Sequence, residues 1–148
     1  MSNLNHQPNY DQDFYAWALE NASLLRQKKF DQIDIEHIAE EIESMGKNDK
    51  RGLISHLRIL IAHLLKWQYQ PGFRTNSWKS TIRNARYQIR ALLEDSPSLK
   101  REIHSKLDRG YKDAVNIASD ETGMLEEVFP KHCPFSLEQC LDSEFFPD

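Results

Sequence analysis

The chain has 148 residues, of which 39% are hydrophobic and 28% are charged, with a formal net charge of −4 at pH 7. A chain of this length buries roughly two-thirds of its unfolded surface on folding, which suffices for a core without metals or disulfides. We therefore expect a single domain over residues 1–148, and the composition requires no cofactor.

The N-terminal sequence and the cysteine content indicate a soluble, cytoplasmic protein that does not bind membranes. The segment MSNLNHQPNYDQ lacks the apolar stretch of a signal peptide. The most apolar stretch, residues 57–65, is too short for a membrane span and contains Arg58 and His63. The two cysteines, Cys133 and Cys140, are too few for a disulfide framework, so we expect reduced thiols that pack in the tail.

Charge is unevenly distributed along the chain. Residues 1–46 carry three Lys and Arg against nine Asp and Glu, residues 47–90 carry ten against one, and residues 91–148 carry six against thirteen. The central block is therefore strongly basic and both flanking blocks are acidic. Such blocks can neutralise one another inside a fold or leave a basic surface exposed.

Apolar residues recur at helical spacing in the first half of the chain, which predicts three helices. The first is expected over residues 11–28, after a flexible N-terminal arm of residues 1–10. The second is expected over residues 34–45, begun by Asp31 or Asp34 as N-cap and ended by Gly46 in the left-handed conformation. The third, over residues 48–69, carries the longest apolar stripe and is predicted to be central; its stripe comprises Leu53, Leu57, Leu60, Leu64 and Trp67.

The second half of the chain predicts two further helices and a tail. Pro71-Gly72 ends the third helix, and the next is expected over residues 76–93. Ser96 and Pro97 have the signature of an N-cap and first turn for a fifth helix that ends at Gly123. The Phe-rich residues 124–148 are expected to add one short helix and to pack on the bundle. The predicted fold is all-α, with about five helices and a short C-terminal helix.

Several short segments along the chain form a recognisable combination: Asp13-Phe14-Tyr15-Ala16-Trp17, Glu40-Glu41-Ile42-Glu43, His63 to Pro71, Ser77-Trp78, Pro97-Ser98-Leu99 and Cys133-Pro134. In these residues the sequence resembles the domain of unknown function 29 family of uncharacterised bacterial proteins. The resemblance covers nearly the whole chain and implies an all-helical single domain. It implies no activity, ligand or catalytic residue.

A cationic stripe accompanies the apolar stripe of the helix expected over residues 76–93. Its members follow at spacings of three and four and are joined by two cations near the preceding turn; together they are Lys66, Arg74, Lys79, Arg83, Arg86 and Arg90. This set suits an anionic partner, and Trp67, Tyr69 or Phe73 can stack on bases where exposed. The alternative is that the rings fill the end of the bundle and the cations are neutralised by Glu36, Glu40 and Glu43.

Two patterns invite catalytic interpretations. Arg51 with His56, and Arg58 with His63, are similar to the Arg-x4-6-His pattern of helical ribonucleases of the HEPN superfamily. That pattern implies His as acid or base and Arg as the group that stabilises the phosphorane. Chance produces about one such match in a chain of this composition. Packing at the edge of the core explains both histidines without a substrate.

A metal site is the second catalytic interpretation. Glu40 and Glu43, with His63 from the next helix, offer ligands for Mg²⁺ or Mn²⁺. The chain lacks the paired Glu-x-x-His motifs of di-iron bundles, so the sequence predicts no metal as the default.

These observations lead to three functional hypotheses. The first is a non-catalytic binding module that engages an anionic macromolecule, either a nucleic acid or an acidic protein surface, through its basic surface. The second is a scaffold that forms homodimers through leftover aromatic surface from Trp17, Trp67 or the Phe-rich tail. The third is a ribonuclease that uses an Arg and His pair or the Glu and His metal site.

Overall fold

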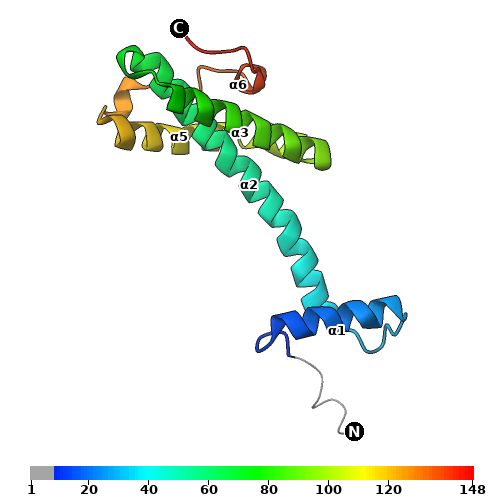
Figure 1. Ribbon diagram of the computed structural model, residues 1–148. Coiled ribbons are helices and arrows are strands. Elements are labelled where there is room, and N and C mark those ends of the chain that lie inside the picture. The colour runs from blue at the N-terminus through cyan, green and yellow to red at the C-terminus, as the bar shows by residue number, and fades with distance from the viewer. Residues whose placement is uncertain (1–8) are drawn as a thin grey trace. The chain divides into compact units, whose positions relative to one another are not determined.

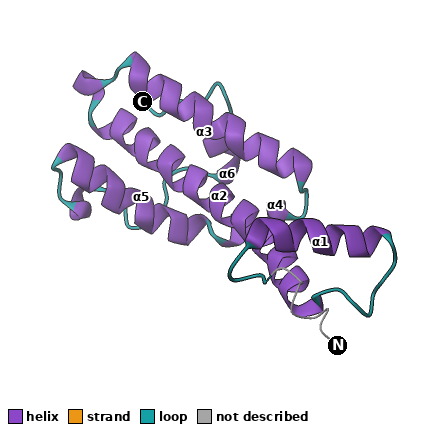
Figure 2. Cartoon of the chain, turned by 60° about the horizontal axis from the view of Figure 1, so that its bottom comes forward, coloured by secondary structure: helices purple, strands orange, loops and turns teal. Residues whose placement is uncertain are grey.

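The computed structural model describes residues 9–148, and this part of the chain is all-α (Figure 1). Helices, including two short 3-10 turns, make up 73% of residues 9–148, and these residues contain no strand, as Figure 2 shows. The six α-helices of this part of the chain are α1 (Phe14–Arg26), α2 (Ile35–Tyr69), α3 (Asn76–Asp95), α4 (Leu99–Ser105), α5 (Leu107–Thr122) and α6 (Leu137–Leu141). The expected fold class, including the short C-terminal helix, is confirmed. None of these helices has the length and apolar character to cross a membrane.

Contacts divide the chain into two compact units, residues 1–47 and 48–148. We call them the N-terminal unit and the C-terminal unit, and helix α2 contributes residues to both. The expectation of a single domain stays a prediction. Of the expected N-terminal arm, residues 1–8 lie outside the described part of the chain, whereas Tyr10 packs against His37 at a ring-centroid distance of 4.0 Å.

The N-terminal unit contains α1 and the first part of α2. Helix α1 begins because the Asp13 side chain accepts a hydrogen bond from the Ala16 backbone N–H at 3.1 Å. Its buried residues are Trp17, Asn21 and Leu24, which follow at spacings of four and three and form one narrow stripe. This stripe faces the loop before α2, where the Asp34 backbone N–H donates to Asn21 at 2.8 Å.

Helix α2 runs without a break through Gly46, where the sequence predicts a helix end. The prediction of two helices over residues 34–45 and 48–69 is therefore wrong. Among the described residues, Gly123 is the only glycine with a positive φ, so Gly46 does not adopt the left-handed conformation. A glycine inside a helix costs only about 1 kcal/mol relative to alanine, and the next proline after Gly46 is Pro71, at the far end of the helix.

The C-terminal unit is built on the apolar stripe of α2. Leu53, Leu57, Leu60 and Leu64 are fully buried, as their spacing predicts. Helix α3 packs on this stripe with Ile82, Ala85 and Ile89, and α5 packs with Tyr111, Ala114 and Ala118; all belong to one core cluster. Figures 1 and 2 both show α3 and α5 beside this part of α2.

The helix expected from Ser96 to Gly123 is two helices, α4 and α5. The expectation is wrong at its start and in its middle. The Ser96 backbone N–H bonds to the Leu92 carbonyl and so closes α3, while α4 begins after Pro97. Lys106, at φ −104° and ψ 2°, then separates α4 from α5. The end of α5 is confirmed, because Gly123 has a φ of 77° as the sequence predicts.

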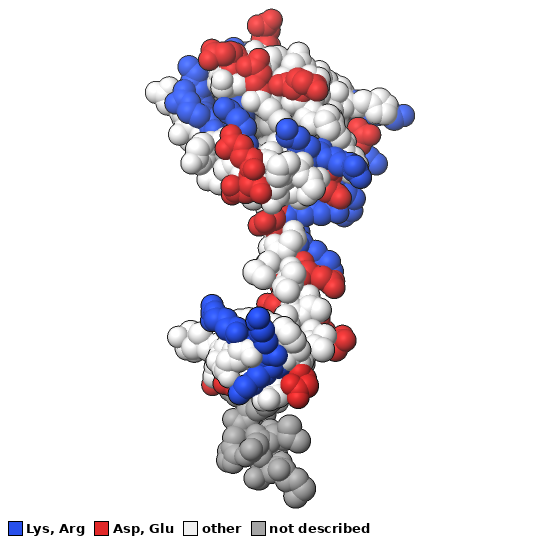
Figure 3. Space-filling model, turned by 90° about the vertical axis from the view of Figure 1, so that its right-hand side faces the viewer, with Lys and Arg blue, Asp and Glu red and all other residues white. Residues whose placement is uncertain are grey.

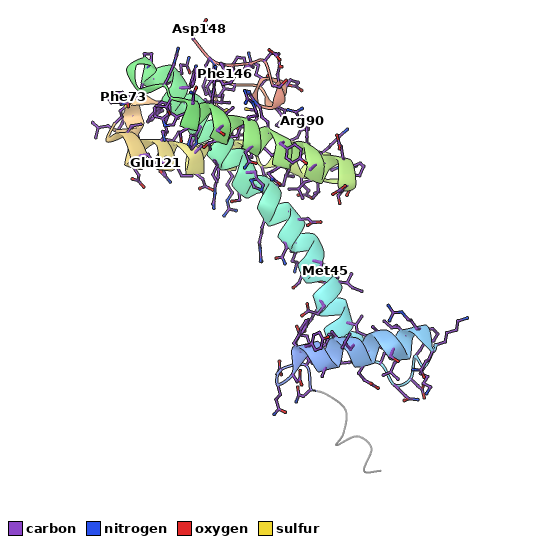
Figure 4. The ribbon with its side chains drawn as sticks, in the orientation of Figure 1. Met45, Phe73, Arg90, Glu121, Phe146 and Asp148 are labelled. Atoms are coloured by element: carbon purple, nitrogen blue, oxygen red, sulfur yellow. The ribbon has the colours of Figure 1, made fainter. Side chains whose placement is uncertain are left out.

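The C-terminal tail crosses α3 and is fixed there by a buried cation. Arg86 on α3 is 1% exposed. Its Nε donates to the Cys140 carbonyl at 2.7 Å, and its Nη2 donates to the Phe145 carbonyl at 2.7 Å. The guanidinium also lies 5.4 Å from the ring of Phe146, which Figure 4 labels. Burying the charge is tolerated because carbonyl oxygens replace its water.

Replacement of Arg86 should unfold the tail. We expect Arg86→Ala to lower the free energy of unfolding by about 3 kcal/mol, because two buried carbonyls lose charged donors. Arg86→Lys should also destabilise, since an ammonium lacks the planar fork that reaches both carbonyls. Urea unfolding followed by circular dichroism measures both. The control is Arg83→Ala, an exposed residue of the same helix, with an expected change within about 0.5 kcal/mol. Equal losses for Arg83→Ala and Arg86→Ala would contradict this role.

Candidate functional site

Helix α3 presents a cationic face. The helix begins at Asn76 because Thr75 caps it, its Oγ1 accepting from the Trp78 N–H at 3.2 Å. Lys79, Arg83 and Arg90 are exposed and lie on one side of α3, because residues at spacings of four and seven share a helix face. Within residues 9–148, none of the three has a carboxylate within ion-pairing distance. Tyr87, 66% exposed, lies beside them. We call Lys79, Arg83, Tyr87 and Arg90 the α3 surface.

The other predicted anion-binding cations have partners inside the C-terminal unit. Lys66 is buried, pairs with Glu121 at 3.1 Å and lies 4.7 Å from the centre of the Trp78 ring. Arg74 donates from Nε to the Trp67 carbonyl at 2.8 Å. Lys66, Arg74 and Arg86 therefore serve the packing of the unit. Anion binding by the six cations stays a prediction, and Lys79, Arg83 and Arg90 are the three of them that are exposed.

The aromatic residues that the sequence suggests for base stacking are mostly engaged in packing. Trp67 lies against Phe146 at a centroid distance of 5.0 Å, and Tyr69 lies against Phe129 at 5.2 Å. Phe73, at the turn after α2, is 65% exposed and is labelled in Figure 4. Of the three suggested rings, only Phe73 presents most of its surface to solvent.

The two Arg and His pairs do not converge on one point. Both lie within α2, and residues five apart on an α-helix are rotated by roughly 140° from each other. Arg51 is exposed, whereas His56 and His63 are half-buried. His63 Nδ1–H donates to the Ile59 carbonyl at 2.9 Å, and burial lowers its pKa, which favours the neutral ring. This geometry suits a core-edge histidine better than an acid paired with a charge-stabilising arginine.

The proposed metal ligands come from both units of the chain. Glu40 and Glu43 belong to the N-terminal unit, while His63 belongs to the C-terminal unit. Across residues 9–148, no group of three or more His, Cys, Asp or Glu side chains is arranged to hold a metal ion. Glu43 instead pairs with Lys47 one turn further along α2, with 3.9 Å between Glu43 Oε2 and Lys47 Nζ.

The sequence did not predict a polar and aromatic cluster in the N-terminal unit. Asp34 Oδ2 accepts from Trp17 Nε1 at 2.9 Å and from His37 Nδ1 at 2.7 Å. Tyr10 stacks on the His37 ring and donates its hydroxyl to Glu41. The cluster joins α1, the loop and α2. The sequence marked Asp34 as a candidate N-cap and Trp17 as a candidate interface residue. It did not predict their contact, because that contact depends on the path of the loop between α1 and α2.

Electrostatics in this cluster favour a charged Asp34 and His37 pair. The hydrogen bond to Asp34 raises the pKa of His37. Burial raises the pKa of Asp34, but hydrogen bonds from His37 and Trp17 outweigh it, so the net direction is downward. The hydrogen bond to Glu41 raises the pKa of Tyr10 to about 12. Asp34 and His37 therefore form an ion pair at the first turn of α2.

The Asp34 and His37 pair predicts a pH-dependent stability. Because the pKa of His37 is raised in the folded state, its contribution to the free energy of unfolding is complete below about pH 6.5. This contribution is lost as pH rises through the pKa of the folded state. The contribution of Asp34 is complete above its unfolded pKa and is lost at lower pH. Thermal unfolding of the wild type and His37→Gln should therefore differ most near pH 5 to 6 and converge at about pH 9.

The matched control for this pH series is His104→Gln, an exposed histidine of α4. Its melting temperature should follow the wild type at every pH. A His37→Gln difference that grows with rising pH would contradict the charged pair.

Comparison with known proteins places the chain in a family. The family model described as "Domain of unknown function DUF29" matches residues 9–146. No curated protein and no solved structure matched the chain in the corresponding comparisons. Because the family match extends over nearly the whole chain, this protein belongs to the family of the domain of unknown function DUF29.

Proposed function

We propose that the protein is a binding module whose α3 surface engages an acidic partner protein. The observation that carries this proposal is the exposure of Lys79, Arg83 and Arg90 on one helix face, without carboxylate partners among the described residues. Tyr87 adds an exposed ring between two arginines. Arginine and tyrosine are the residue types that most often anchor protein interfaces.

Charge balance favours an acidic protein over a nucleic acid. The C-terminal unit, residues 48–148, carries fifteen Lys and Arg against fourteen Asp and Glu. Figure 3 shows acidic and basic side chains interspersed on the face of this unit that it draws. Three cations release few counterions when they bind a duplex. The logarithm of the binding constant would then fall with the logarithm of salt concentration with a slope of about −3, whereas strong nucleic-acid binders reach about −10. A protein surface with a few carboxylates matches this charge better than a phosphate backbone does.

Charge reversal on α3 tests the proposal. We expect Arg83→Glu with Arg90→Glu to abolish capture of the partner by immobilised protein, with thermal stability unchanged, because both side chains are exposed. The matched control is Lys100→Glu with Arg101→Glu, which changes the net charge equally on α4 and should retain the partner. Captured proteins are identified by mass spectrometry for all three proteins.

Nucleic-acid binding is measured in parallel. Fluorescence anisotropy of a labelled single-stranded oligonucleotide at low and moderate salt should show weak binding at most. Tight, salt-dependent binding that the α3 variant loses would replace the acidic protein with a nucleic acid. Equal capture by the wild type and both variants would end the proposal.

A second candidate function, self-association, is favoured by the apolar surface of the N-terminal unit. Within residues 9–148, twelve large hydrophobic residues are exposed, and eight of them lie in this unit: Phe14, Tyr15, Leu19, Leu25, Phe30, Ile35, Ile42 and Met45. Ile35, Ile42 and Met45 are each 60% exposed and share one stripe of α2; Figure 4 labels Met45. Trp17 and Trp67, from which the sequence suggests an interface, are buried and half-buried. An apolar surface of this kind marks an interaction site.

Sedimentation velocity tests self-association through this stripe. We expect a dimer at micromolar concentration that Ile42→Asp with Met45→Asp converts to a monomer, because each carboxylate would lie in an apolar interface. Leu125→Asp is the matched control, since Leu125 is 70% exposed in the C-terminal unit. A wild type that stays monomeric over this range removes the second candidate.

A further inference from the structure

The two cysteines lie in the same part of the C-terminal unit but differ in exposure. Cys140, on α6, is fully buried, whereas Cys133, in the loop before it, is half-buried. Both thiols are free, and both side chains belong to or pack against the core cluster. Six residues separate them in the sequence, and each thiol shifts the pKa of the other, as neighbouring side chains do.

The backbone around the two thiols is fixed at both ends. Ser136 and Gln139 form a reciprocal capping box at the start of α6. Arg86 Nε holds the Cys140 carbonyl at 2.7 Å. At the other end, the Cys133 thiol donates to the Phe135 carbonyl, with an Sγ to oxygen distance of 3.3 Å. These hydrogen bonds hold the backbone near each of the two cysteines.

Only Cys133 opens onto a cavity. The cavity has a volume of about 290 Å³ and is lined by Asp108, Tyr111, Lys112, Lys131, His132 and Cys133. One water occupies about 30 Å³ in the liquid, so the cavity has room for a solute the size of hydrogen peroxide. Cys140 has no exposed surface, so a solute reaches this pair through Cys133.

The titration of the two thiols supports the same order of reactivity. The hydrogen bond with Cys140 lowers the pKa of Cys133, although burial acts in the opposite direction. The same interaction, together with burial, raises the pKa of Cys140. Because the thiolate is the reactive form of cysteine, Cys133 reacts first and Cys140 keeps its proton.

We propose that Cys133 and Cys140 form an oxidation site at which hydrogen peroxide converts the dithiol to an intramolecular disulfide. The Cys133 thiolate attacks one peroxide oxygen, so an S–O bond forms, the O–O bond breaks and the departing hydroxide takes up a proton to become water. Cys140 sulfur, giving up its proton, then attacks Cys133 sulfur; the S–S bond forms and the S–O bond breaks with loss of a second water. Two thiols are oxidised, and one peroxide is reduced to two waters.

Intact-mass spectrometry of the full chain tests this site. Purified protein treated with a small excess of hydrogen peroxide should lose two hydrogen atoms without forming a disulfide between two chains, and dithiothreitol should restore the two hydrogen atoms. Cys140→Ala should instead accumulate a sulfenic acid at Cys133 that dimedone traps, because the resolving thiol is missing. Cys133→Ala should lose its remaining thiol at least about tenfold more slowly than the wild type loses its thiols, because Cys140 is buried.

Three results would overturn the proposal. The first is a wild type that keeps both thiols under peroxide, and the second is a Cys133→Ala variant that oxidises as fast as the wild type. The third is a disulfide that forms only between chains. Circular dichroism of each variant confirms folding, and Cys140→Ser provides a second replacement if Cys140→Ala loses structure. The outcome is independent of the α3 surface, so failure here leaves the proposed function untouched.

Discussion

The buried guanidinium of Arg86 is the constraint on which the arrangement of the C-terminal unit depends. An arginine charge is costly to remove from water, and it is accepted only where oxygen atoms replace its hydration shell. Here the tail supplies these atoms through the Cys140 and Phe145 carbonyls. Burial also holds the tail, since Leu137 and Cys140 belong to the core cluster and Phe145 and Phe146 pack against it. The polar anchor and this burial together position α6, and with it Cys140.

The same crossing divides the cations of α3 between two roles. Arg86 lies within the stripe that Lys79, Arg83 and Arg90 define, and spacing alone assigns all four to one surface. The tail covers α3 at Arg86 and leaves the other three exposed. Helical periodicity specifies which residues share a face, but it does not specify where another segment of the chain crosses that face.

The residues that were predicted well from the sequence are those whose environment is local or repetitive. The leucine stripe of α2 is buried as its spacing requires, and Gly123 ends α5 with the conformation that favours glycine. Gly46 has the same residue type but lies within a helix, because no neighbouring residue opposes continuation. The Trp17 and Asp34 contact was not predictable, since it depends on how a loop turns between two helices. The residue type therefore determines which backbone conformations are allowed, and the neighbouring segments determine which of them the residue adopts.

Residues 63–86 are rich in both cations and aromatic rings, although the chain as a whole is acidic. Contacts between these rings and cations account for this composition. Lys66 lies over Trp78, and Arg74 lies over Trp67. A buried cation gains from the negative face of an aromatic ring, a contribution that grows to about 2 kcal/mol once water is excluded. In a nucleic-acid binder, rings and cations of this kind face outward, whereas here most of them stabilise each other inside the unit. Three cations of this segment and its continuation on α3, Lys79, Arg83 and Arg90, remain exposed, and the proposed binding of an acidic partner rests on them.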